Sequence, residues 1–130
     1  MPTAKGRFEI RRTPQAPVDL GGDAQAMHMR FDKRFEGDMD ATSVVHMLAA
    51  MTAVEGSAAY VAIERVEGRL GERSGSFLLR HCGTMDRGAP TLDLQVVSDS
   101  ADGELEGLRG SIRIDIVDGE HFYVFDYTMR

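Results

Sequence analysis

A histidine and a cysteine stand side by side near the middle of the chain, and a glutamate lies in the run before them. His81 and Cys82 are the residue types of a thiol nucleophile and its general base, while Glu64 and His81 could form an acid–base pair. Which chemistry is available depends on which side chains share a face, because adjacent residues of a β-strand point to opposite sides. In a strand, Cys82 therefore cannot act together with His81, whereas Glu64 on a neighbouring strand can.

Apolar and polar residues alternate between turns over most of the chain, which is the pattern of β-strands. Eight strands are expected, over residues 6–13, 26–37, 43–53, 60–70, 74–85, 91–98, 110–117 and 121–129. The segment 43–53 is rich in Ala, Met and Leu, which favour a helix, but its surroundings favour a strand and we interpret it as one. The segment 14–22 contains two prolines and two glycines, and it is expected to be a loop.

Turn residues predict how these strands pair. The dipeptide Asp-Gly at 118–119 tolerates the positive φ of a type I′ turn, which predicts a two-residue hairpin. Similar tips are expected at 87–88 and at 73–74. The last of these places Glu64 and His81 on one face of the sheet, together with mostly apolar and aromatic neighbours.

This face is expected to line the interior of the protein. Its Glu64 and His81 are the candidate catalytic residues, acting as acid and base or orienting a polar ligand; the alternative is an internal hydrogen bond that fixes strand register. The candidate ligand-binding residues are Tyr60, Glu64, Phe77, Leu79, His81, His121, Tyr123 and Tyr127. No two histidines have the close spacing of metal ligands, so we predict no metal site and no cofactor.

Length and composition limit the classes of protein to consider. The 130 residues suffice for one domain, expected over 1–130, with its own core. A net charge of −6 with scattered basic residues argues against nucleic acid as a partner. The sequence offers no apolar run long enough to cross a membrane and no signal-peptide core, and its single cysteine suits a reducing compartment. We therefore expect a cytoplasmic protein.

Eight antiparallel strands need their edges paired, and closure into a small β-barrel achieves this. A sandwich of two sheets is the alternative architecture. An eight-stranded barrel can be filled by side chains or can hold one small ligand. A buried glutamate would be costly in a dry interior, so Glu64 favours a wet or ligand-bearing cavity. Some strands, such as 77–79 and 122–125, are apolar on both faces, which predicts a homo-oligomer that covers the second face.

Three ordered blocks carry a resemblance to a known family: Y-V-A-I-E-R from Tyr60, G-S-F-L-L-R-H-C-G-T-M-D-R-G from Gly75, and G-E-L-E-G-L-R-G from Gly103. From about Lys33 onward the chain resembles the bacterial DUF3224 family, a domain of unknown function. That family is similar in fold to allene oxide cyclase, which implies a small antiparallel β-barrel, often oligomeric, with an axial cavity. The resemblance implies no catalytic residue, because the family has no established reaction.

These observations predict a binding module, in which a barrel holds a small, partly apolar molecule with Glu64 and His81 as polar anchors. One alternative is a cofactor-free enzyme of isomerase or cyclase type that uses the same pair. A second alternative is a structural oligomer with a filled barrel.

Overall fold

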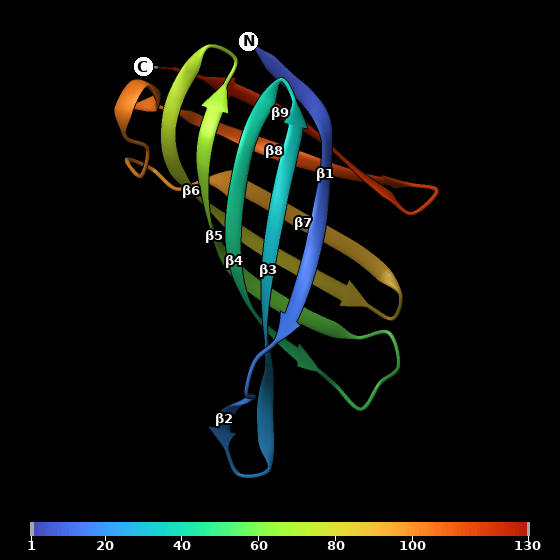
Figure 1. Cartoon of the computed structure of the whole chain (residues 1–130). Helices are drawn as coiled ribbons and strands as arrows, with labels where there is room; N and C mark the ends of the chain where they lie inside the picture. The colour runs from blue at the N-terminus through green and yellow to red at the C-terminus, as the bar shows by residue number, and fades with distance from the viewer. Residues whose placement is uncertain (1, 130) are drawn as a thin grey trace.

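The computed structural model describes residues 2–129, which fold almost entirely as β-strands (Figure 1). The elements are β1 (Thr3–Pro14), β2 (Val18–Gly21), β3 (Ala24–Gly37), β4 (Met39–Met51), β5 (Ala58–Leu70), β6 (Arg73–Asp86), β7 (Ala89–Val96), the short 3₁₀ turn η1 (Gly103–Leu105), β8 (Arg109–Val117) and β9 (Glu120–Thr128). The described residues contain no α-helix, and thus no helix able to cross a membrane. The predicted strand over 43–53 is confirmed by β4.

Eight of these strands close into an antiparallel barrel, in the order β1-β9-β8-β7-β6-β5-β4-β3, with β3 pairing back onto β1. The barrel prediction is confirmed, and the sandwich alternative is not what forms. Closure pairs β1 with both β3 and β9, so neither of its edges stays open over the shared length.

The ninth strand, β2, lies in the segment that we expected to be a loop, and in that respect the prediction was wrong. The Asp19 carboxylate accepts a 2.8 Å hydrogen bond from the Gly21 backbone N–H, which turns the chain tightly. This turn lets Val18 pair with Ala26 on β3. The prolines therefore precede a short hairpin, and the glycines lie at its tip (Figure 1).

The strand registers follow the turn chemistry closely, with one instructive shift. Val117 pairs with Glu120, as the Asp-Gly turn predicted, and Gly119 takes a φ of +80°. The turn between β5 and β6 lies at 71–72, so Glu64 pairs with Leu79; a tip at 73–74 would have paired it with Gly83. Four positions is an even displacement, so the side chains that share a face are unchanged.

The two ends of the barrel differ. At the end where both termini lie, the connection from β7 to β8 packs against the barrel (Figure 1). Its Leu105 and Leu108 are buried in the same apolar core as Phe77 and Phe125. The apolar core is concentrated here. At the opposite end, which β2 extends, the interior remains partly open.

Candidate functional site

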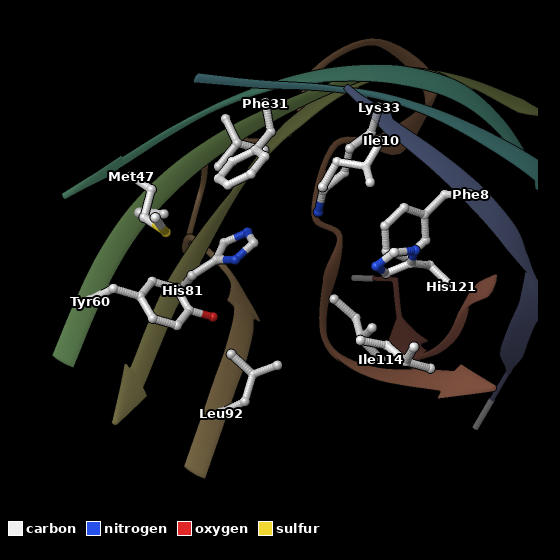
Figure 2. Close-up of a pocket in the computed structure, with 13 residues that line it drawn as sticks. Phe8, Ile10, Phe31, Lys33, Met47, Tyr60, His81, Leu92, Ile114 and His121 are labelled. Atoms are coloured by element: carbon white, nitrogen blue, oxygen red, sulfur yellow. The ribbon is translucent and has the colours of Figure 1, made fainter. Parts of the chain in front are cut away.

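A pocket of about 230 Å³ occupies the interior at the open end of the barrel (Figure 2). All eight strands of the barrel contribute to it, since inward-facing positions alternate along each of them. Its lining is largely apolar and comprises Phe8, Ile10, Phe31, Lys33, Val45, Met47, Tyr60, Ala62, His81, Leu92, Ile114, Ile116 and His121. The polar groups are few, which is the usual composition of a small-molecule site.

Glu64 lies at the inner end of this pocket, fully buried, and is bonded by three side chains from three other strands. The Lys33 ammonium on β3 and the His81 Nε2 on β6 both donate to Oε1, at 3.2 and 2.7 Å. The Ser43 hydroxyl on β4 donates to Oε2 at 2.6 Å. We call Lys33, Ser43, Glu64 and His81 the polar floor of the pocket.

The polar floor holds Glu64 in its charged form. Burial alone would raise the pKa of this carboxyl. The Lys33 charge and the hydrogen bonds from His81 and Ser43 together outweigh the effect of burial, and the pKa is lowered. Lys33 is itself stabilised by aromatic faces, with its nitrogen 4.8 Å from the centroid of the Phe8 ring and 5.8 Å from that of Phe35. The result is a compact, neutralised ion pair in an apolar interior.

His81 joins the polar floor to the open pocket. An ionised carboxylate can only accept, so the imidazole nitrogen that contacts Glu64, Nε2, carries the hydrogen. Nδ1 is then the ring nitrogen that Glu64 leaves free, an acceptor in the uncharged imidazole, and the ring faces the pocket (Figure 2). A carboxylate that orients an imidazole is the arrangement by which proteins present a base or a hydrogen-bond acceptor to a ligand.

Tyr60 forms the wall next to His81, and a glycine makes room for it. Its ring lies across Gly83, where an added Cβ would stand only 2.0 Å from Tyr60 Cε1. The hydroxyl points into the pocket (Figure 2). Burial, followed by the proximity of Cys82 and Glu64, raises the pKa of Tyr60, so this hydroxyl keeps its proton and can donate.

The predicted ligand-binding residues divide into two groups. Tyr60, His81 and His121 line the pocket and Glu64 lies directly beneath it, so the structure brings these four together. The others lie in the packed half of the barrel, away from the pocket: Phe77, Leu79, Tyr123 and Tyr127.

Tyr123 in particular has a bonding role within the fold. Its hydroxyl accepts from the backbone N–H of Met39 at 2.9 Å and donates to the carbonyl of Glu36 at 2.8 Å. These bonds tie β9 to the tight connection between β3 and β4.

Two members of the polar floor, Lys33 and Ser43, were not among the predicted residues. The signal was present in the spacing, because Lys33 lies two positions from both Phe31 and Phe35 and must share their inward face. Ser43 likewise lies two positions from Val45. A charged residue in phase with apolar neighbours is therefore the pattern that would have identified Lys33.

The outer face carries a separate group of polar side chains. His28 Nε2 and His46 Nδ1 are 2.8 Å apart, and the Arg80 guanidinium donates to the Cys82 sulfur at 3.3 Å. Cys82 thus lies on the opposite face from His81. Within residues 2–129, no cluster of three or more His, Cys, Asp or Glu side chains is arranged to hold a metal ion.

The fold and the pocket define the class: a small, closed, antiparallel β-barrel with a polar floor beneath an apolar pocket. The chain belongs to the DUF3224 family, described as a protein of unknown function, whose model matches residues 4–127. A crystal structure of a DUF3224 protein of unknown function from Shewanella oneidensis MR-1, at 1.84 Å resolution, is 44% identical. It superposes with a TM-score of 0.92 over 100% of this chain and 98% of that one. No curated protein matches the chain.

Proposed function

We propose that this protein binds a small, partly apolar molecule in the pocket at the open end of the barrel. The observation that supports this most directly is the polar floor, an ion pair with an oriented imidazole at the inner end of an otherwise apolar pocket. A fold that needed only stability would gain as much from apolar side chains in these positions, because a buried ion pair contributes little net stability.

The size of the pocket suggests a bicyclic ligand. An apolar cavity of about 150 Å³ holds a benzene molecule, and this pocket measures about 230 Å³. Beyond Tyr60 and Leu92 it continues into a second, more open space of about 400 Å³ that is lined by Met, Ala, Pro and Thr side chains. A ligand could therefore extend an apolar part from the polar floor towards the mouth.

Binding can be tested with N-phenyl-1-naphthylamine, an uncharged dye that becomes fluorescent in apolar sites. We expect saturable fluorescence with one dye per chain. The Ala62→Leu variant fills the pocket, since Ala62 is 5% exposed and lies beside His81, and it should abolish the signal. Val61→Leu changes the outward-facing neighbour on the same strand and is the matched control. Equal fluorescence from both variants, each shown to be folded by circular dichroism, would exclude this pocket as the site.

A second candidate function is catalysis without a cofactor, favoured by the 2.7 Å contact between Glu64 and His81. In such an enzyme, His81 Nδ1 takes a proton from a carbon next to a carbonyl, and the C–H electrons pass to the carbonyl oxygen to form an enolate. Exchange of the α-protons of 2-tetralone in D₂O, followed by NMR, tests this step. Exchange no faster than with His81→Gln would rule it out for this substrate type.

We also propose that the barrel forms a homo-oligomer in a reducing compartment such as the cytoplasm. Leu48, Val61 and Ile63 lie together on the outer face of β4 and β5, and Val61 and Ile63 are more than half exposed, which supports a covered face. Light scattering after gel filtration should give a multiple of the chain mass, and Ile63→Glu should reduce it to one chain. A monomeric wild-type protein would refute the proposal.

A further inference from the structure

The polar floor also indicates which head group the ligand carries. Resting on the proposed binding function, we propose that the head group is an uncharged hydroxyl, as in an alcohol or a phenol, and that the site selects against carboxylates. The hydroxyl donates to His81 Nδ1 and accepts from Tyr60 Oη.

The charges in and around the pocket disfavour an anionic head group. Among the described residues that line the pocket, Lys33 is the one Lys, Arg, Asp or Glu side chain. Its charge is already balanced by the Glu64 carboxylate at 3.2 Å. A ligand carboxylate reaching Lys33 would stand close to a second, fully buried carboxylate while losing its own hydration. Arg12 lies at the mouth, with its guanidinium 5.9 Å from the centroid of the Phe31 ring, but it is exposed and water screens its charge.

The hydrogen-bonding groups favour a hydroxyl over a purely apolar ligand. Nε2 of His81 donates to Glu64, so Nδ1 of the uncharged ring is left as an acceptor. An apolar ligand would displace water from Nδ1 and offer no hydrogen bond in its place. Tyr60 supplies the complementary donor. Its strand partner is Gly83, and that of His81 is Ala62, so the two side chains are diagonal neighbours on one face. One hydroxyl can therefore bond both, and each is seen facing the same space in Figure 2.

Four probes of nearly equal size test this at neutral pH by displacement of N-phenyl-1-naphthylamine: 2-naphthol, 2-methoxynaphthalene, naphthalene and 2-naphthoate. We expect 2-naphthol to bind about tenfold more tightly than the methoxy compound, the effect of one buried neutral hydrogen bond. The ionised 2-naphthoate should bind most weakly. Tyr60→Phe keeps the ring over Gly83 and should reduce the advantage of 2-naphthol over naphthalene several-fold without changing the affinity for naphthalene.

The outcomes separate the two proposals. If 2-naphthoate binds as tightly as 2-naphthol, or the methoxy compound does, the hydroxyl inference is overturned while the binding function stands. If neither the dye nor any naphthalene binds, the binding function itself fails. An unchanged preference for 2-naphthol over naphthalene in Tyr60→Phe would remove Tyr60 from the head-group site and overturn the two-bond geometry.

Discussion

Replacing Lys33 by methionine is the sharpest test of the polar floor, because it removes the positive charge that neutralises Glu64 and keeps a side chain of similar length. Glu64 is fully buried, so its carboxylate would face an apolar interior with only the His81 and Ser43 hydrogen bonds left. Breaking a buried pair by removing one partner costs about 3–5 kcal/mol. The two remaining hydrogen bonds place the expected loss of unfolding free energy at the lower end, about 3 kcal/mol.

Urea unfolding followed by circular dichroism measures this loss. With a denaturant slope of about 2 kcal/mol per molar urea, the midpoint should fall by about 1.5 M. The chain contains one other lysine, Lys5, which is exposed on β1, and Lys5→Met is the matched control with a change below about 0.5 kcal/mol. If the unfolding free energy of Lys33→Met lies within about 1 kcal/mol of that of wild type, the substitution has left no uncompensated buried charge. That result would refute the assignment of a buried ion pair.

The pH dependence of the same variant gives an independent check. Protonation of Glu64 removes the uncompensated charge, so the difference between wild type and Lys33→Met should shrink as the pH falls from 7 towards 4. Adding Glu64→Gln should recover much of the lost stability at pH 7, since both charges are then absent. A double variant that is as unstable as the sum of the two single variants would show that the charges do not interact.

Three further predictions follow from the same contacts. Because the folded-state pKa of Glu64 is lowered, its charged form contributes stability above the ordinary pKa of 4.5, and this stability is lost as the pH falls through the lowered pKa. Acid unfolding of wild type and Glu64→Gln should therefore show a stability difference that shrinks in this pH range. A difference that stays constant would contradict the prediction. Gly83→Ala should displace the Tyr60 ring, lowering stability by about 1–3 kcal/mol and weakening dye binding, whereas unchanged dye binding would place Tyr60 outside the site. Tyr123→Phe leaves the Met39 N–H without its partner and should cost about 1–3 kcal/mol in urea unfolding without affecting dye binding; an unaltered midpoint would contradict this role.

Much of the fold could be predicted from the sequence because strand faces have a period of two. The turn between β5 and β6 was placed two positions late, yet Glu64 and His81 still shared a face, since only an odd slip exchanges the faces. The β2 hairpin was missed because its sequence offers no such periodic pattern. Its strand is only four residues long, too short for alternation to be visible, and it depends on a hydrogen bond that the Asp19 carboxylate accepts from the Gly21 N–H.

The candidate site was predictable in its parts but not in its boundary. Alternation places Tyr60, Tyr123 and Leu79 on the same interior surface, but it does not say how far along the barrel axis the packing continues. That limit is set by the segment after β7, whose Leu105 and Leu108 plug one end. The plug is a loop without periodicity, so the division between packed core and open pocket requires the structure.

The position of the polar floor ties stability to binding. It lies where the apolar core ends and the pocket begins, so the same hydrogen bonds satisfy Glu64 and orient His81 towards the pocket. A variant such as Lys33→Met should therefore impair both properties, and loss of binding alone would not reveal a direct contact. Tyr60→Phe removes only a hydroxyl at the pocket wall, outside the floor, and should change affinity with little change in stability. Comparing the two variants in both assays distinguishes a group that supports the site from one that contacts the ligand.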